Sequence, residues 1–222
     1  MRYFIGDTET TGLSRAKAVE IAFVEIDPET LEIERTWSSL IDPEIPIEPM
    51  AQSIHGISSE MLECEPTIEE FVQVILGGRI EEPCTLIGHN VQFDKPFFDP
   101  VMNVVKTYCT LGLSRRMFPT GPENHKLGTM KDYLKLEGGE AHRALGDVHT
   151  VHQMLRLLIP QTGRSLLDLL QVPAHTIYTM PWGEHAGKQL SDIPVSYRTW
   201  LLSVNIDEDL RRSLMQLRSA GI

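Results

Sequence analysis

Apolar and polar residues alternate over three segments near the start of the chain. The segments are residues 3–7, 18–26 and 31–40, and turns around Gly12 and at residues 29–30 separate them. A period of two is typical of β-strands, because successive side chains of a strand point to opposite faces of a sheet. We therefore predict three antiparallel strands that form a meander.

Prolines break this pattern between residues 43 and 49, and helical signals follow. Residues 50–55 and 58–61 predict two brief helices on either side of Gly56. A further helix is predicted over residues 67–76, because this segment opens with the cap-like sequence Thr-Ile-Glu-Glu and continues with apolar spacing.

Strand-like and helical segments then follow one another up to residue 160. Early strands and later helices favour an α/β fold, in which helices flank a mixed sheet. Apolar spacing of 3.6 residues supports the last two helices. The predicted elements are a buried strand at 85–88, a helix that begins at 95–96, a last strand at 109–113, and helices at 127–136 and 144–159, the second with Pro160 as its stop.

The 222 residues suffice for one full-sized catalytic domain and an appendage of about 50 residues. Pro173 marks the expected boundary, which predicts domains at 1–172 and 173–222. The expected elements of the second domain are a strand at 176–180, a turn at 181–183, and helices at 195–203 and 207–218.

The formal net charge of −11 is unusual for a protein that binds nucleic acid, because phosphate binding normally depends on Lys and Arg. Of the 20 Lys and Arg and the 31 Asp and Glu, residues 175–222 hold 5 of each, so the excess of acid lies entirely before them. This excess is either a solvated acidic surface or a carboxylate cluster that bound divalent cations neutralise. Charge alone does not choose between the two.

The cysteines and the N-terminus carry no targeting or framework signal. Cys64, Cys84 and Cys109 are widely spaced and form no Cys-x-x-Cys pair, which argues against both a disulfide framework and a zinc knuckle. The first residues lack the apolar core of a signal peptide, and no segment has the ~18 uninterrupted apolar residues of a membrane span. We therefore expect a cytoplasmic protein without a membrane partner.

Asp7 and Glu9 lie two residues apart at the end of the first predicted strand, so both side chains are expected on one face. Two adjacent carboxylates repel each other unless a cation lies between them, and oxygen ligands are the ones that Mg²⁺ and Mn²⁺ prefer. The pair is therefore a candidate metal platform. Taken alone, Asp-x-Glu is a common pattern, and two ordinary carboxylates at an exposed turn are the favoured explanation.

Two later segments carry similar candidates. Asp94 follows a strand and lies in the first turn of a helix, where it is either catalytic or a stabiliser of the helix N-terminus. His142 precedes the helix that contains Asp147, an arrangement suited to a movable general base beside a fixed metal ligand, although His142 could also be a surface loop residue. His149 and His152 are spaced three apart, but no third ligand supports a zinc site.

The combined pattern resembles the DEDDh family of 3′-to-5′ exonucleases, which has an RNase H-like fold and includes polymerase proofreading subunits. The resemblance covers roughly residues 3–160 and implies a mixed five-stranded sheet. Its motifs are Asp7-Thr8-Glu9-Thr10-Thr11-Gly12-Leu13, His89-Asn90 with Phe93-Asp94, and His142-Arg143-Ala144 with Asp147, supported by Val19-Glu20-Ile21-Ala22 and Ile54-His55-Gly56-Ile57.

The resemblance extends into the tail of the chain. Residues 180–202 look like the small module that follows the nuclease domain in exodeoxyribonuclease X-like proteins. This module is either a packing appendage or a DNA contact. The matching residues are Met180-Pro181-Trp182-Gly183-Glu184-His185-Ala186-Gly187-Lys188, then Pro194, Tyr197, Trp200 and Leu201.

Membership of this family implies a metal-dependent hydrolase that acts on single-stranded DNA or DNA 3′ ends and releases nucleoside 5′-monophosphates, in DNA repair or end trimming. Two Mg²⁺ or Mn²⁺ ions are expected per active site. The implied general base is His142, and the implied metal ligands are Asp7, Glu9, Asp94 and Asp147.

Substrate contacts are expected mainly at the loop that contains Gly12 and Leu13, because Gly12 lets the backbone approach the substrate and Leu13 can pack on an unpaired base. Two alternatives stay open, namely an RNA-trimming exonuclease of the same fold and a non-catalytic partner of a polymerase or repair protein. The sequence does not indicate the oligomeric state. The expected substrate-binding residues are Thr8, Thr10, Gly12, Leu13, His55 and Asn90.

Overall fold

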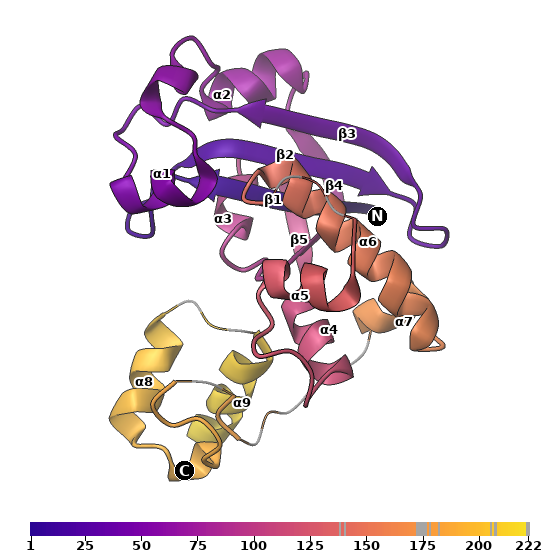
Figure 1. Cartoon of the computed structure of the whole chain (residues 1–222), viewed down its shortest axis with the longest axis vertical. Coiled ribbons are helices and arrows are strands. Elements are labelled where there is room, and N and C mark those ends of the chain that lie inside the picture. Colours follow the sequence, from indigo (N-terminus) through magenta and orange to yellow (C-terminus); the bar gives the residue numbers. More distant parts are fainter. Residues whose placement is uncertain are drawn as a thin grey trace. The chain divides into compact units, whose positions relative to one another are not determined.

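The computed structural model consists of two compact units, Met1–Leu170 (unit 1) and Gln171–Ile222 (unit 2) (Figure 1). The predicted boundary residue, Pro173, lies outside the described residues, so the predicted division into 1–172 and 173–222 stays a prediction. The structure describes residues 1–137, 139, 141–171, 177, 179–181, 183–204, 206 and 208–220.

A mixed five-stranded sheet is the centre of unit 1, which confirms the predicted α/β fold class. Its strand order is β3-β2-β1-β4-β5. The first three strands pair antiparallel and form the predicted meander, whereas β4 pairs parallel to β1 and β5 pairs parallel to β4. The strands are β1 (Arg2–Thr10), β2 (Ala18–Ile26), β3 (Ile33–Leu40), β4 (Ile80–Gly88) and β5 (Met102–Cys109).

Helices connect and cover the strands of unit 1. The predicted capping box is present, because the Thr67 hydroxyl accepts a hydrogen bond from the Glu70 amide and the Glu70 carboxylate accepts one from the Thr67 amide. The helices are α1 (Pro49–His55), a 3₁₀ turn (Ser59–Leu62), α2 (Ile68–Glu70) with a π-helical continuation (Phe71–Ile75), α3 (Lys95–Phe98), α4 (Thr110–Met117), α5 (Leu127–Leu134), α6 (Ala144–Gln161) and α7 (Leu166–Gln171).

The strand predicted at residues 109–113 is wrong. The last strand ends at Cys109, and α4 begins at the next residue. Thr110, Leu113 and Ser114 are buried together, and their spacing of three and four residues is that of a helix face. A segment this short presents too few apolar positions for its period to be read from sequence.

Pro160 does not stop the helix that contains it, because α6 continues to Gln161. Proline removes a backbone donor and obstructs the preceding turn. Pro160 is the penultimate residue of α6, so the helix ends before the effect of the proline reaches further turns. The predicted helix is therefore confirmed, and only its predicted C-terminal end is wrong.

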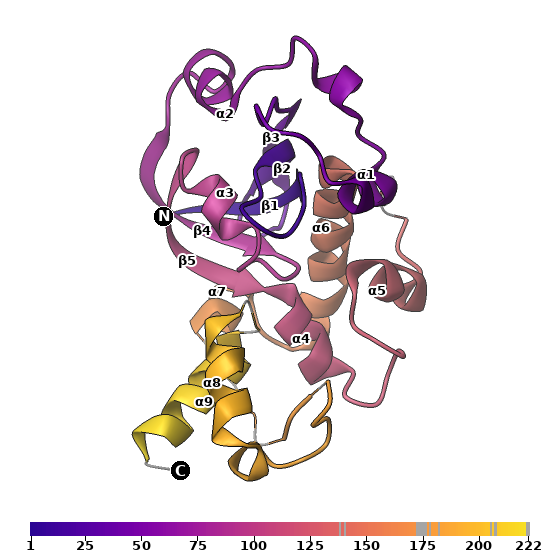
Figure 2. The same cartoon turned by 90° about the vertical axis from the view of Figure 1, so that its left-hand side faces the viewer.

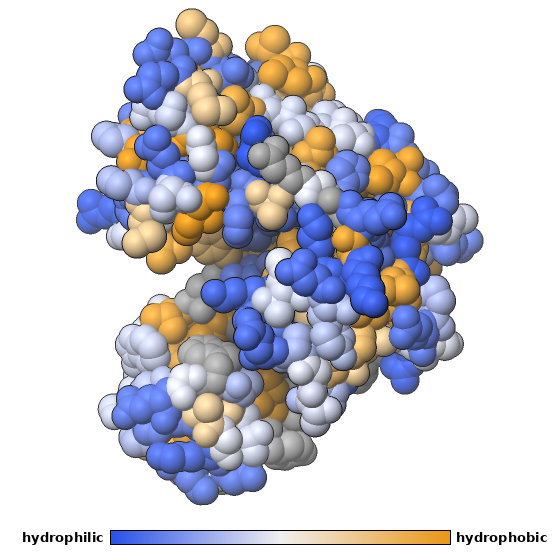
Figure 3. Space-filling model, in the orientation of Figure 1, coloured by the Kyte–Doolittle hydropathy of each residue, from blue (hydrophilic) through white to orange (hydrophobic). Residues whose placement is uncertain are grey.

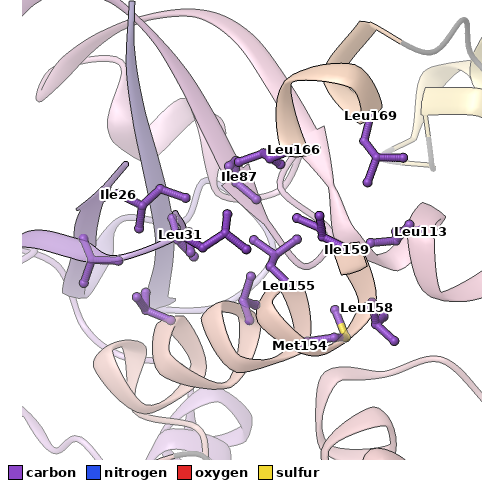
Figure 4. Close-up of a cluster of buried hydrophobic side chains, with 14 of the residues drawn as sticks. Ile26, Leu31, Ile87, Leu113, Met154, Leu155, Leu158, Ile159, Leu166 and Leu169 are labelled. Carbon is purple, nitrogen blue, oxygen red and sulfur yellow. The ribbon is translucent and has the colours of Figure 1, made fainter. Parts of the chain in front are cut away.

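Side chains of β1 alternate between two hydrophobic cores. Ile5 belongs to the core that α6 covers, and Leu155 of α6 projects toward Leu31 and Ile87 in this core (Figure 4). Phe4 belongs to the core on the opposite face. Burying one such side chain stabilises the fold by about 1.5–3 kcal/mol, so the two cores fix which face each residue of β1 presents.

Gly6 allows α3 to pack closely against β1. A Cβ atom at Gly6 would lie 2.6 Å from the ring of Phe98, the last residue of α3, and 2.9 Å from Leu86. Real Cβ atoms do not approach other heavy atoms this closely, so no larger residue fits without displacing α3. The contact places Asp94, which immediately precedes α3, near the C-terminal half of β1. Figure 2 shows α6 running alongside β1 and β2.

Unit 2 has a separate hydrophobic core formed by Met180, Leu190, Ile193, Leu201, Ile206, Leu210 and Leu214. The predicted helix at 195–203 is confirmed as α8 (Val195–Ser203), and the helix predicted at 207–218 is α9 (Glu208–Ser219), with residue 207 outside the described part. Thr179 forms an isolated antiparallel bridge with Gln189. Residues 176 and 178 of the predicted strand at 176–180, and residue 182 of the predicted turn at 181–183, lie outside the described residues.

A short 3₁₀ turn, Leu190–Asp192, precedes α8. Across the described residues of both units, no helix combines the length and the apolar character needed to cross a membrane.

Candidate active site

Asp7 and Glu9 lie in the C-terminal half of β1, on the face that α6 covers. They follow Ile5 with a period of two, and Ile5 packs in the α6 core. In the antiparallel register Asp7 lies opposite Ala22 and Glu9 lies opposite Glu20. The register shifts directly after Glu9, an irregularity of the kind that often occurs beside active sites.

The beginning of α6 brings Asp147 and His142 to the same place. Glu9, His142 and Asp147 each offer one potential ligand atom, and these three atoms lie within 4.8 Å of one another. The backbone N–H of His142 donates a hydrogen bond to the Asp147 carboxylate. His142 itself is exposed and has a left-handed backbone with φ of 58°, which turns the chain into α6.

Asp94 reaches the site from the opposite face of β1. Its Oδ1 atom accepts hydrogen bonds from the Thr8 hydroxyl at 2.8 Å and from the Thr8 amide at 3.2 Å. Thr8 points away from its neighbours Asp7 and Glu9, because strand side chains alternate. Consequently β1 contributes to the site with both faces. Asp94 is 4% exposed, and its hydrogen bonds with Thr8 fix its position.

The four carboxyl groups have raised pKa values. Burial, followed by the charges of Asp94 and Asp147, raises the pKa of Asp7 well above its usual range. Burial and the nearby Asp147 raise the pKa of Glu9 to about 8. Burial is also the main cause for Asp94, whose pKa rises to about 7, and for Asp147. A positive charge bound among these four acids would favour their ionised forms.

Glu20 holds the N-terminus of α6. Its carboxylate, 4% exposed, forms a bidentate ion pair with Arg143, in which the Nη2–Oε1 distance is 2.8 Å, and accepts a hydrogen bond from the Ala144 amide, also at 2.8 Å. Free amides and the helix dipole make a helix N-terminus favourable for a carboxylate. The contact links β2 to α6 across more than 120 residues of sequence and thereby positions Asp147.

Arg143 also serves the electrostatics of the site. Glu20 lies directly opposite Glu9 across two strands, and like charges in that position destabilise a sheet. The Arg143 guanidinium offsets this repulsion, and it lowers the pKa of Glu9 against the larger effect of burial. From the sequence, Glu20 was named only as part of a supporting motif of the resemblance, and its partners were not found.

The loop after β1 is shaped by Glu48. The Glu48 carboxylate occupies the position that a Cβ atom of Gly12 would take, and the Glu48 amide donates to the Thr11 carbonyl at 2.8 Å. The Thr10 hydroxyl donates to the Gly12 carbonyl at 2.9 Å. Gly12 therefore leaves room for the Glu48 side chain, which a larger residue at this position would displace. Leu13 extends from this loop with 86% of its surface exposed.

Helix α1 begins directly after Glu48 and adds exposed apolar side chains, Met50 and Ile54, one helical turn apart. On the face drawn in Figure 3, hydrophobic residues show among hydrophilic ones in the part of unit 1 that carries α1 and α2. The hydrogen bond from Glu48 to Thr11 ties the start of α1 to the loop that carries Leu13.

His55 is buried, and both of its ring nitrogens contact backbone. Nδ1 accepts from the Ile57 amide at 3.0 Å, so the neutral ring carries its proton on Nε2 and donates to the Thr10 carbonyl at 3.3 Å. Burial lowers the pKa of His55, which keeps the ring neutral. These contacts are those of a satisfied loop histidine that holds the end of β1, and the expected role of His55 in substrate binding stays a prediction.

The motif His89-Asn90 divides into a half-buried and an exposed residue. His89 Nε2 lies 2.6 Å from the His125 carbonyl, to which it donates, and burial lowers the pKa of His89 to about 4. Asn90 is exposed with φ of 76°. His89 therefore ties the segment before α5 to the end of β4, while Asn90 stays accessible to a ligand.

The arrangement fits divalent cations. The carboxylates of Asp7, Glu9, Asp94 and Asp147 converge from β1, from the residue before α3 and from α6, and their pKa values are raised mainly by burial. Hard cations with oxygen ligands supply the missing charge. His142 lies beside this group and could take part in proton transfer.

A family model described as Exonuclease matches residues 4–155. The chain belongs to this exonuclease family. The resemblance to the DEDDh type, drawn from three motifs, is thereby confirmed, as is the RNase H-like fold.

Individual relatives of the exonuclease agree with this assignment. The chain is 29% identical to Exodeoxyribonuclease 10 of Escherichia coli strain K12 over 211 residues, 90% of each chain. Among solved structures, Exonuclease X in complex with 5′ overhanging duplex DNA has a TM-score of 0.59 and 29% identity, covering 76% of this chain and 99% of that one. E. coli Exonuclease I in complex with a dT13 oligonucleotide shares the fold, with a TM-score of 0.63, 20% identity, and coverage of 76% and 43%.

The raised pKa values predict that the metal-free exonuclease loses stability as pH rises. The folded state binds more protons than the unfolded state between pH of about 4, where ordinary carboxyl groups titrate, and about 8, the pKa of Glu9. Unfolding free energy therefore falls across this window. Melting temperatures measured in a chelator from acid to mildly alkaline pH should fall accordingly, and saturating Mn²⁺ should reverse the fall by ligand linkage. Glu9→Gln should flatten the profile, and a melting temperature indifferent to Mn²⁺ near pH 8 would contradict this account.

Glu20→Gln should weaken the attachment of α6 and misplace Asp147. We expect a loss of about 1–3 kcal/mol in unfolding free energy, measured in urea, because Arg143 loses its charged partner. We also expect activity to fall about 10- to 100-fold, as is usual when a residue that orients a metal ligand is changed.

Glu25→Gln is the matched control for this prediction. Glu25 is a buried acid of the same strand, 5% exposed, and pairs with Arg2 and Arg35 instead of α6. This variant should lose stability while keeping its turnover. Equal losses of turnover in the two variants would show that Glu20 has no special place in the site.

Proposed function

We propose that this exonuclease hydrolyses DNA from the 3′ end and releases nucleoside 5′-monophosphates, using two Mg²⁺ or Mn²⁺ ions. The observation that carries the proposal is the convergence of four carboxyl groups and one exposed imidazole at the C-terminal end of β1. Two findings support DNA as the substrate. One relative is named an exodeoxyribonuclease, and two similar structures were solved in complex with DNA. We place its role in DNA repair or end trimming.

In the proposed mechanism Asp7, Glu9 and Asp147 would hold one cation, and Asp7 with Asp94 would hold the second. When bound, such a pair of cations activates a water molecule and stabilises the leaving 3′-oxygen of the scissile phosphodiester. The carboxylates keep their ligand oxygens in place because Thr8 fixes Asp94 and the His142 amide fixes Asp147. The acidic character of unit 1 is then compatible with a polyanionic substrate.

His142 acts as the general base in this proposal. Its ring lies within reach of the Glu9 and Asp147 carboxylates, and its exposure gives the attacking water access. The His142 imidazole accepts the proton from that water and later releases it to solvent. The water oxygen forms the new bond to phosphorus, and the bond from phosphorus to the 3′-oxygen breaks.

Leu13 and Asn90 contact the terminal nucleotide in this proposal, because both are exposed and each lies four residues in sequence from a proposed metal ligand, Glu9 and Asp94 respectively. An apolar side chain can pack on an unpaired base without reading its identity. Thr8, Thr10 and His55 have their side-chain polar atoms engaged within the protein, so we assign them to holding the loop in shape. Gly12 contributes a loop conformation that accommodates Glu48.

Asp7→Asn should abolish metal-dependent removal of 3′ nucleotides while leaving the fold intact, and His142→Ala should lower turnover by about 10²- to 10⁴-fold because the general base is lost. Release of a 3′ label from single-stranded DNA measures both. His149→Ala, a change on α6 outside the proposed site, should be close to the parent. Near-normal trimming by Asp7→Asn would remove the mechanism.

Polarity and substrate are tested by digestion of matched DNA and RNA strands, labelled at either end, with and without Mg²⁺. We expect early release of the 3′ label, late release of the 5′ label, and a preference for DNA. A lasting preference for RNA would instead assign the chain as an exoribonuclease of the same fold. Failure to cleave either strand would favour a non-catalytic binding module.

A further inference from the structure

Three aromatic side chains of unit 2 form a cluster at its surface, namely His185, Tyr197 and Trp200. Tyr197 and Trp200 lie three residues apart on α8 and therefore share one side of the helix. Their ring centroids are 5.2 Å apart, and the His185 ring meets Tyr197 edge-on at 4.6 Å. The proposed catalytic mechanism makes no use of this cluster.

The cluster is anchored on one side and open on the other. Leu201 of α8 is fully buried and Tyr197 packs against the core of unit 2. Trp200 is 49% exposed and is not among the described residues that form or contact that core. A large aromatic ring braced by a second ring, with half of its surface exposed, can receive a ligand with little loss of conformational entropy.

Positive charge accompanies the rings. The Lys188 ammonium lies 3.3 Å from His185 Nδ1. Residues 175–222 hold 5 basic and 5 acidic residues, so this part of the chain lacks the acid excess of the remainder. Aromatic rings combined with a cation are the features that single-stranded nucleic-acid sites use, since bases stack on the rings while phosphates contact the cation.

Around the cluster, the described residues form no extended apolar patch of the kind that the core of a protein interface normally requires. Within the described residues of unit 2, Val195 and Met215 are the other large apolar side chains that are exposed.

We infer that the cluster of His185, Tyr197, Trp200 and Lys188 is a second binding site for single-stranded DNA, which stacks unpaired bases of the strand whose 3′ end is digested. The inference rests on the proposed function. The site would increase affinity for long strands without taking part in hydrolysis.

Trp200→Ala tests the inference in the full-length protein. Fluorescence anisotropy of a labelled oligothymidylate of about 30 nucleotides, longer than one stacking site, should show binding weakened roughly 5- to 100-fold. With Mg²⁺, KM for the same strand should rise, whereas kcat and the kinetics on a trinucleotide should stay as in the parent. Trp200→Phe should restore binding, because a flat ring is kept.

Val195→Ala is the matched control, since Val195 is 66% exposed on the same helix and outside the cluster. Its binding and melting temperature should equal those of the parent. Unchanged DNA affinity in Trp200→Ala would overturn the inference and leave a protein partner as the occupant of the cluster. A parent that binds the strand through Trp200 but does not hydrolyse it would instead remove the proposed function, so the two failures are distinguishable.

Discussion

Electrostatic repulsion among buried carboxylates is the constraint on which this structure depends. Asp7, Glu9, Asp94 and Asp147 are brought together at the end of β1, where burial penalises their charged forms. Without cations, such a cluster opposes folding. The fold therefore has to supply enough stability from elsewhere to hold the four groups in place.

That stability comes from elements that approach β1 from both sides. Hydrophobic cores on the two faces of the sheet determine the direction of each β1 side chain. The Glu20 carboxylate then attaches the N-terminus of α6 to β2, through its ion pair with Arg143 and the hydrogen bond that it accepts from the Ala144 amide. Close packing of Phe98 on Gly6 does the same for α3. The contacts that position the carboxylates therefore lie outside the carboxylate cluster itself.

Features that depend on local pattern were predictable from the sequence. The period of two gave the common face of Asp7 and Glu9, and the long apolar spacing gave α6 with Asp147 near its start. The short helix α4 was mistaken for a strand, because its few apolar residues do not define a period. The partners of Glu20 and the contact of Glu48 with Gly12 could not be predicted, since they arise from tertiary contacts between segments far apart in sequence or in separate loops.

The alternation of β1 has a consequence for how this family can diverge. Thr8 faces one helix while Asp7 and Glu9 face another. Inserting or deleting one residue within the strand would exchange the two sets of side chains and dismantle both halves of the site at once. Evolution can therefore alter this strand only by point replacement, whereas the exposed segment from Leu13 to Arg15 can vary in length without exchanging the two faces of β1.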